Sequence, residues 1–333
     1  MAGPMKILVI GTGGIGRRHA RTISDLRPDT AFLAVRSEPS EATRELDMQL
    51  VPDMEAAIGE VPDAAVIALP PVLHAETAAA LIDAGIPVYL EKPIAMDAEE
   101  IRPAVEEAER QGLVTMAGCN LRFVPAFRMI RDLIGSGDIG AVRHAQLSCG
   151  QWLPDWRPGR DYRTTYSAGA EMGGGVLRDL IHEIDLARFW FGEFPDVTAR
   201  MENSGALDID CEDHADLILW HPGTTVSIHL DYLDRAKHRR GRIIGAEGSI
   251  VYDAIGGILS RYDGAEPDGR ELAGREAFDL AESNRAALQH FLSCVEAGTP
   301  TQQPLREGLL SLALADAARA SGQSAALSSD GSP

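Results

Sequence analysis

The sequence predicts an α/β part followed by an α+β part: a doubly wound parallel sheet near the N-terminus, then an open antiparallel sheet. Up to about residue 121, short apolar runs alternate with amphipathic helical stretches, which is typical of a parallel sheet covered on both faces. Beyond it, apolar and polar residues alternate with period two, as in antiparallel strands with one polar face. We therefore expect two domains in this 333-residue chain, 1–121 and 122–333.

The elements follow from these patterns in chain order. In the first part we expect strands over 6–10, 31–35, 64–69, 88–90 and 114–117, with helices over 15–26, 73–84 and 98–111. In the second part a helix over 124–135 precedes strands around 145–149 and 226–232, a hairpin turn at 247–248, and helices over 277–296 and 305–321.

Composition excludes several classes of protein. A formal charge of −19 argues against a nucleic-acid partner, which needs clustered Lys and Arg. The one basic run, 235–242, is interpreted as a solvated or interface stretch, with contact to an anionic ligand as the alternative. The four cysteines form no CxxC pair, which favours reduced thiols. No signal-peptide core or membrane-spanning run is evident, so a soluble, cytoplasmic protein without membrane partners is expected.

A glycine-rich loop follows the first predicted strand and opens a helix. Gly11, Gly13 and Gly16 satisfy the G-x-G-x-x-G pattern, with Gly14 and Ile15 between them. Such a loop allows a tight turn, close approach of the backbone to a pyrophosphate and tight helix–strand packing. The sequence therefore predicts a Rossmann-type dinucleotide site.

The end of the second predicted strand bears on the choice of nucleotide. NAD sites usually carry an acid here to bind the ribose 2′-hydroxyl, whereas this chain has Arg36 and Ser37. A cation beside a hydroxyl suits a 2′-phosphate, which favours NADP. Glu38 follows directly, and a shifted turn would bring it to the ribose and favour NAD instead.

Three further segments carry candidate chemistry. Glu91-Lys92-Pro93 leaves a parallel strand at its carboxyl end, where ligands of such sheets bind. Asp179 and His182 are three residues apart, and thus on one face if that segment is helical. Pro70 and His74 leave another strand end and lead into a helix.

Together these segments resemble the Gfo/Idh/MocA oxidoreductases from end to end. The motifs that match, in the family's order, are the glycine loop, Pro-x-x-x-His at 70–74, Glu-Lys-Pro at 91–93, the segment 118–123, Gly-Gly-Gly and Asp-x-x-His within 173–182, and the hairpin at 245–248. The stretch 152–163, with residues 181–183, is similar to members associated with sialic-acid-type sugars.

The resemblance implies roles for particular residues. Lys92 would lie near the nicotinamide, while Asp179 and His182 would face the substrate carbon. A histidine can take the hydroxyl proton as hydride leaves, and a lysine can stabilise the oxyanion. We also expect nucleotide contacts from Pro70, His74, Glu91 and Asn120, and substrate contacts from Lys92, Arg122, Trp156, Arg157, Tyr162, Asp179 and His182.

Other roles remain open for some of these residues. Asp179 would orient His182, bind a sugar hydroxyl, or only pair with Arg178 or Arg163. His74 either touches the nicotinamide or packs where its helix begins. Glu91 fixes the ribose or the Lys92 backbone. No metal site is expected, because no other His or Cys converges on His182, Glu183 and Asp185.

The predicted function is an NAD(P)-dependent oxidoreductase that moves hydride between the nicotinamide and a hydroxyl or keto carbon of a sugar derivative. One alternative is a redox-neutral hydrolase or epimerase that recycles a bound NAD. Another is a non-catalytic nucleotide sensor or binding subunit. The free polar face of the second sheet predicts a homodimer or homotetramer.

Overall fold

The computed structural model describes residues 4–323. By its internal contacts the chain forms two compact units. The N-terminal unit joins Met1–Phe123 to Leu280–Leu312, and the C-terminal unit joins Val124–Asp279 to Ala313–Pro333. The first segment of the N-terminal unit ends at Phe123, two residues after the predicted domain boundary at 121. Residues 280–312, which the sequence-based division leaves in the second domain, pack in the N-terminal unit.

The N-terminal unit is built on a six-stranded sheet in the order β3-β2-β1-β4-β5-β6, with every strand parallel to its neighbours. This order confirms the predicted doubly wound Rossmann sheet. The strands are β1 (Lys6–Ile10), β2 (Ala31–Val35), β3 (Gln49–Val51), β4 (Ala64–Ile67), β5 (Val88–Leu90) and β6 (Thr115–Ala117). The short edge strand β3 was not predicted: its sequence, Gln-Leu-Val, lacks the continuous apolar run that marked the other strands of this sheet.

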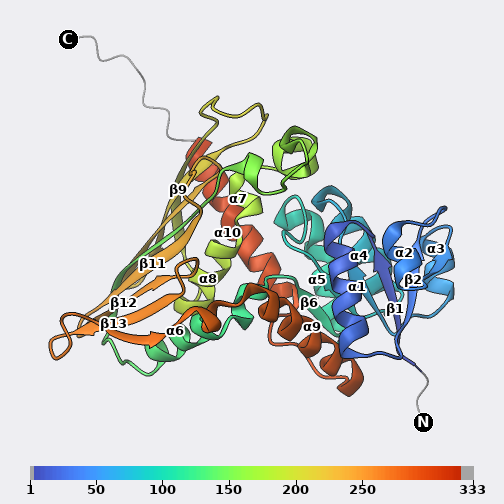
Figure 1. Cartoon of the computed structure of the whole chain (residues 1–333), viewed down its shortest axis with the longest axis horizontal. Coiled ribbons are helices and arrows are strands. Elements are labelled where there is room, and N and C mark those ends of the chain that lie inside the picture. Colours follow the sequence, from blue (N-terminus) through green and yellow to red (C-terminus); the bar gives the residue numbers. More distant parts are fainter. Residues whose placement is uncertain (1–3, 324–333) are drawn as a thin grey trace. The chain divides into compact units, whose positions relative to one another are not determined.

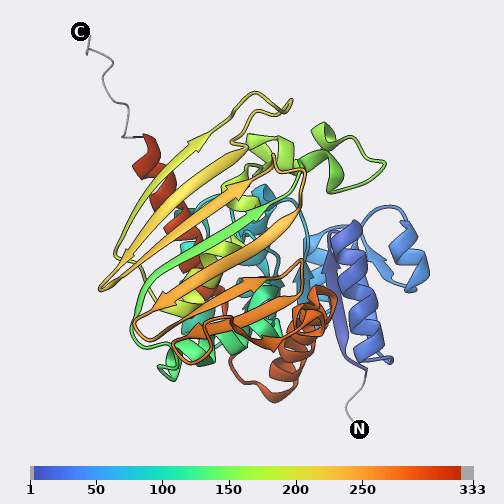
Figure 2. The same cartoon turned by 60° about the vertical axis from the view of Figure 1, so that its left-hand side comes forward.

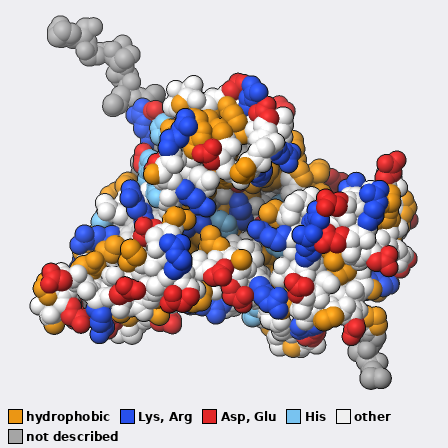
Figure 3. Space-filling model, in the orientation of Figure 1, with side chains coloured by type: hydrophobic (Ala, Val, Ile, Leu, Met, Phe, Trp, Pro, Cys, Tyr) orange, Lys and Arg blue, Asp and Glu red, His pale blue; other side chains and the backbone are white. Residues whose placement is uncertain are grey.

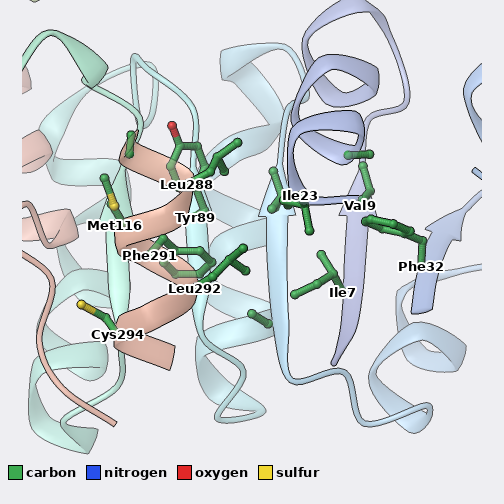
Figure 4. Packing of buried hydrophobic residues seen from close by; sticks show 14 of the residues in the cluster. Ile7, Val9, Ile23, Phe32, Tyr89, Met116, Leu288, Phe291, Leu292 and Cys294 are labelled. Carbon is green, nitrogen blue, oxygen red and sulfur yellow. The ribbon is translucent and has the colours of Figure 1, made fainter. Parts of the chain in front are cut away.

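Helices cover both faces of this sheet (Figure 1). They are α1 (Gly14–Leu26), α2 (Glu41–Glu45), α3 (Met54–Gly59), α4 (His74–Asp83), α5 (Ala98–Gln111) and α9 (Leu280–Ala297). Figure 4 shows Leu288, Phe291 and Leu292 of α9 lying against Tyr89 and Met116 of the sheet. All five side chains are completely buried. This apolar contact places the late segment α9 in the N-terminal unit.

The C-terminal unit contains an eight-stranded sheet in the order β14-β13-β12-β11-β7-β10-β9-β8. The strands are β7 (Val142–Gly150), β8 (Asp196–Glu202), β9 (His214–His221), β10 (Thr224–Asp231), β11 (His238–Gly245), β12 (Gly248–Asp253), β13 (Ile258–Asp263) and β14 (Arg270–Ala273). The sheet is mostly antiparallel, as predicted. The central pair β7–β10 is parallel, however, because long connections separate these strands in the chain.

One face of this sheet packs on helices, which lie behind it in Figure 2. They are α6 (Pro125–Gly135), α7 (Val176–Asp179), α8 (His182–Phe191) and the end of α10 (Leu305–Gln323). Trp190 of α8 contacts Phe127 and Tyr252 edge-on, and its indole N–H donates to the Phe127 carbonyl oxygen at 2.9 Å. The other face bears alternating polar residues, among them Gln146, Ser148 and Arg242.

Charged side chains of both signs are interspersed over the face seen in Figure 3. The four cysteines are free and buried. Among residues 4–323, none of the helices has the length and apolar character needed to cross a bilayer.

Candidate active site

The glycine loop joins β1 to α1, as predicted. A side chain at Gly16 would place its Cβ 1.8 Å from the carbonyl oxygen of Gly11, so only glycine fits there. At Gly13 and Gly14, by contrast, a Cβ would meet no protein atom within 4 Å. The helix begins at Gly14 without a side-chain cap, and Ile15 is 43% exposed in its first turn. The loop therefore presents backbone amides toward open space, as a phosphate site requires.

Arg36 follows β2 and returns to the glycine loop. Its Nη1 donates to the Thr12 hydroxyl at 3.0 Å, and its Nε donates to the carbonyl oxygen of Glu38 at 2.8 Å. Ser37 and Glu38 are exposed beside it. Two hydrogen bonds thus hold the cation predicted to meet a 2′-phosphate next to the glycine loop.

Lys92 lies two residues after β5 ends at Leu90, at the carboxyl edge of the parallel sheet. The Lys92 backbone N–H donates to Oε2 of Glu91 at 3.3 Å, which is one of the two roles foreseen for that carboxylate. Oε1 of Glu91 lies 2.5 Å from Nε2 of the buried His19. Burial acts to raise the pKa of Glu91, but the hydrogen bond to His19, with Lys92 and Arg18 nearby, holds it below its usual value.

His74 is buried where α4 begins, and both of its ring nitrogens contact backbone carbonyls. Nδ1 is 2.8 Å from the Pro93 oxygen, and Nε2 is 2.8 Å from the Leu69 oxygen. Burial lowers the pKa of His74 below its usual value, against these two bonds. Pro70, half-buried, lies in the same loop between β4 and α4. The ring thus ties the loop after β4 to the turn that carries Lys92.

Asn120 and Arg122 are buried in the N-terminal unit. The Asn120 amide donates to the Ser283 hydroxyl at 2.8 Å, and Nη1 of Arg122 is 2.9 Å from the Glu307 carboxylate. Both partners come from the returning segment 280–312. These bonds give both side chains a role in joining that segment to the unit, and their predicted contacts with nucleotide and substrate remain predictions.

In the C-terminal unit, Asp179 is 2% exposed and accepts hydrogen bonds from two tyrosines. The Tyr166 hydroxyl donates to Oδ1 at 2.6 Å, and the Tyr232 hydroxyl donates to Oδ2 at 3.1 Å. Burial, together with the charge of Asp179, raises the pKa of Tyr232 well above its usual value, so this tyrosine keeps its proton. Each carboxylate oxygen therefore has a fixed donor.

The glycine motif at 173–175 brings one of these tyrosines to Asp179. A Cβ at Gly174 would lie 2.4 Å from the Tyr166 carbonyl oxygen, so the chain can pass this close only with glycine. Asp179 then ends α7, and His182 begins α8. The expectation of one continuous helical face is wrong, because Leu180 and Ile181 form a turn between two helices.

Glu183, one of the acids beside His182, is engaged in an ion pair. Glu183 is buried and pairs with Arg239 of β11 at 2.6 Å. Among residues 4–323, no cluster of three His, Cys, Asp or Glu side chains is placed to hold a metal ion. Within the basic run 235–242, Arg239 is directed to the buried Glu183, while the Arg235 guanidinium lies 3.6 Å from the centroid of the Trp152 ring.

The predicted substrate residues separate into two groups. Trp156 packs edge-on against Tyr232, and the guanidinium of Arg157 lies 5.2 Å from the centre of the Tyr166 ring. Both therefore border the tyrosines that bind Asp179. Tyr162 instead accepts a hydrogen bond from the backbone N–H of Asp208 at 3.1 Å.

Sequence reasoning missed Tyr166 and Tyr232 as partners of Asp179, and His19 as the partner of Glu91. Tyr232 is 53 residues from Asp179, and His19 is 72 residues from Glu91. The only available signal was a polar side chain on an otherwise apolar face. His19 shares the buried face of α1 with Ala20 and Ile23.

Comparison with known proteins decides the family. Residues 5–119 match the model of the oxidoreductase family with an NAD-binding Rossmann fold, and residues 127–251 match the GFO/IDH/MocA C-terminal domain. The chain belongs to the Gfo/Idh/MocA family. The predicted resemblance and fold class are thereby confirmed, as is the class of enzyme, an oxidoreductase with an NAD-binding domain.

Among Gfo/Idh/MocA relatives, the inositol 2-dehydrogenase of Rhizobium meliloti is 28% identical, over 93% of this chain and 94% of that protein. The 2,7-anhydro-N-acetylneuraminate hydratase of Mediterraneibacter gnavus is 27% identical over 56% of this chain and 50% of its own length. A levoglucosan dehydrogenase, solved with NADH and levoglucosan, has the same fold, with a TM-score of 0.84 and 21% identity over 96% of this chain and 98% of its own.

Proposed function

We propose that this protein is a dehydrogenase that exchanges hydride between a nicotinamide dinucleotide and a secondary hydroxyl carbon of a sugar or cyclic polyol. The observation that carries the proposal is the buried Asp179 carboxylate, fixed by two tyrosine hydroxyls three residues before His182. The same chain carries Lys92 at the carboxyl end of β5 in an NAD-binding fold. Relatives named for inositol and levoglucosan support this substrate class.

The glycine loop fits a dinucleotide. The open space at Gly13 and Gly14 and the uncapped start of α1 suit the pyrophosphate. Pro70, Glu91 and Asn120 remain our candidates for contacts further along the nucleotide. For its ribose we propose Arg36 and Ser37, and hence a preference for NADP(H) over NAD(H), because a guanidinium fixed beside the loop complements a phosphate.

When bound, the nicotinamide supplies the carbon that accepts or returns the hydride. His182 removes the proton from the substrate hydroxyl as the carbonyl forms, and returns it in reduction. The Lys92 ammonium is proposed to stabilise negative charge that develops on the substrate.

Asp179 accepts hydrogen bonds from its two tyrosine donors and orients His182 or a substrate hydroxyl. Trp156 and Arg157, which border those tyrosines, are proposed to contact the sugar ring and its substituents. A planar indole packs well against the apolar face of a sugar, and a guanidinium donates to hydroxyl or carboxylate oxygens.

A redox-neutral reaction is the second candidate, and the hydratase among the relatives favours it. A bound nicotinamide would supply the uptake of hydride from a sugar carbon and its return to the product, while the same side chains would assist the elimination or addition of water. The cofactor would then stay bound through many turnovers rather than be exchanged.

The experiment that tests the proposal is a nicotinamide absorbance assay of the purified full-length protein. It is offered inositols, levoglucosan and anhydro-sugar acids with each of NAD and NADP. Net reduction of the nucleotide by a polyol supports the dehydrogenase. A product formed with no net change in nucleotide supports the redox-neutral reaction, and turnover of none of these compounds contradicts both.

We also propose an oligomeric state and a cellular compartment for this protein. The polar face of the eight-stranded sheet, which packs on none of the described helices, is proposed to meet a second copy of the chain in a homodimer or homotetramer. The four free, buried thiols suit a reducing compartment, and we propose the cytoplasm.

A further inference from the structure

Two buried histidines contact the Glu91-Lys92-Pro93 turn from different elements. His19 of α1 lies 2.5 Å from Oε1 of Glu91, the residue before Lys92. His74 of α4 lies 2.8 Å from the carbonyl oxygen of Pro93, the residue after it. Each histidine is 1% exposed. The turn is therefore held on both sides of the lysine by rings that solvent hardly reaches.

His74 connects this turn to a second loop. Its other nitrogen, Nε2, is 2.8 Å from the Leu69 carbonyl oxygen, just beyond β4. Carbonyl oxygens only accept hydrogen bonds, so both contacts are hydrogen bonds only when the ring carries two protons. The charge of Glu91 favours that state, whereas burial and the charge of Lys92 oppose it. A neutral ring keeps one of the two bonds.

His19 acts on the other side of Lys92 through Glu91. Oε1 of that carboxylate contacts His19, while Oε2 accepts the Lys92 backbone N–H at 3.3 Å. The His19 ring is supported edge-on by Tyr89, with 5.4 Å between ring centroids. His19 lies in the helix that the glycine loop opens, so the element that would bind the pyrophosphate also fixes the backbone of Lys92.

We propose that His19 and His74 are positioning residues for Lys92: they fix the backbone before and after it, so that its ammonium is held at the carboxyl edge of the parallel sheet. The proposal rests on the proposed function, in which Lys92 stabilises the substrate oxyanion. Neither histidine takes part in the reaction itself. Their effect passes through the Glu91 side chain and the Pro93 backbone.

Asparagine and glutamine variants separate the individual bonds. The amide nitrogen of Asn lies close to the position of a histidine Nδ1, and that of Gln lies close to Nε2. His74→Asn therefore keeps the bond to Pro93, whereas His74→Gln keeps the bond to Leu69. At the other histidine the order reverses, because His19→Gln keeps the bond to Glu91 and His19→Asn loses it.

In steady-state assays of the full-length protein, His74→Gln and His19→Asn should lower kcat about 10- to 100-fold, as displaced supporting groups do. His74→Asn and His19→Gln should stay within several-fold of the wild type. The nucleotide KM should be nearly unchanged in all four. A purely structural role predicts equal kcat for Asn and Gln at each position, and that result would overturn the proposal.

A second measurement does not depend on turnover. The chain has three lysines, Lys6, Lys92 and Lys237, so acetylation of each can be followed by mass spectrometry in one sample. The rate at Lys92 relative to Lys237 should change several-fold in His74→Gln and His19→Asn and little in their matched partners. An unchanged ratio in both would contradict the proposal. The Asn and Gln variants at His19 test the proposal independently of those at His74. If the variants at one of the two histidines do not fold, the pair at the other still decides.

The two measurements also separate this proposal from the proposed function. If the wild type oxidises no polyol, the dehydrogenase assignment fails, while the lysine ratios still decide whether these histidines position Lys92. If the wild type is active and the ratios and kcat values are alike in every variant, only the positioning proposal fails.

Discussion

The Tyr166 hydroxyl donates to Oδ1 of Asp179 at 2.6 Å, while the Tyr232 hydroxyl donates to the other carboxylate oxygen, Oδ2, at 3.1 Å. Tyr166 is half-buried, whereas Tyr232 is completely buried in the C-terminal unit. The two bonds therefore differ in how readily water can replace them.

Tyr232→Phe should lower the free energy of unfolding by about 1.5–3 kcal/mol, the usual value of a hydrogen bond to a charged group. Tyr166→Phe should cost about 1 kcal/mol or less, because water can take its place. Urea denaturation measures both. Tyr262→Phe, on the half-buried strand β13, is the matched control and should be near neutral. Equal losses in the two variants would contradict this account of Asp179.

His182→Ala and Lys92→Ala should each lower the rate of hydride transfer by about 10²–10⁴-fold, since one removes the base and the other the oxyanion partner. Asp179→Asn should do less if Asp179 only orients its neighbours. Single-turnover nicotinamide absorbance measures the step, and nucleotide affinity should stay within several-fold in His182→Ala. The exposed Lys237→Ala serves as the lysine control. If His182→Ala retains wild-type rates, the base lies elsewhere, and Tyr166 is then the first residue to test.

Arg36→Ala should weaken NADP(H) binding by about 1.5–3 kcal/mol and leave NAD(H) nearly unaffected, because only the former offers a phosphate to the guanidinium. Titration calorimetry with both nucleotides gives the comparison. Arg44→Ala removes another exposed cation, on α2, and it controls for the general loss of charge. A wild type that prefers NAD(H), or equal losses for both nucleotides in Arg36→Ala, would rule out this assignment.

His229 on β10 should remain protonated well above neutral pH. Its hydrogen bond to Asp231, opposed by burial and aided by Asp216, raises its pKa to about 9. The raised pKa means that protonated His229 adds to the free energy of unfolding. This contribution is complete below the unfolded-state pKa of about 6.5, and it is lost as the pH rises through about 9. An NMR titration of the His229 ring proton checks this. Asp216→Asn and Asp231→Asn should each lower that pKa, and a wild-type midpoint near 6.5 would refute the prediction.

Light scattering at micromolar concentration should give a mass at least twice the 35.8 kDa of one chain. Gln146→Arg places a second cation beside Arg242 on the open sheet face and should shift the protein toward the monomer. Glu76→Arg, an exposed change on α4, should leave the mass unaltered. A monomeric wild type would mean that water covers this sheet face.

Local patterns were sufficient for most of the N-terminal unit. The glycine loop, the strand that ends before Lys92 and the helix 98–111 are all determined by neighbouring residues, and the structure places them as predicted. The break between α7 and α8 was not visible, because Leu180 and Ile181 are apolar and fit a helix as well as a turn. The pairing of β7 with β10 depends on contacts some 80 residues apart, which no periodicity encodes.

In the candidate site, too, contacts between residues far apart in the chain could not be predicted from sequence patterns. Lys92, Asp179 and His182 stand in short motifs and could be selected by sequence. The partners that hold them, such as Tyr232 for Asp179 and His19 for Glu91, are distant in the chain and have no motif of their own. Hydrogen bonds of this kind depend on three-dimensional packing, so they become evident only once the strands and helices are assembled.

The return of residues 280–312 to the N-terminal unit affects how the protein can form during synthesis. Tyr89 and Met116 leave the ribosome long before Leu288 and Phe291, which cover them in the finished fold. Part of an apolar face of the parallel sheet thus stays uncovered until α9 has been synthesised, a condition that promotes misfolding and aggregation. The nucleotide-binding unit is completed only when residues 280–312 are made, although its last strand already ends at Ala117.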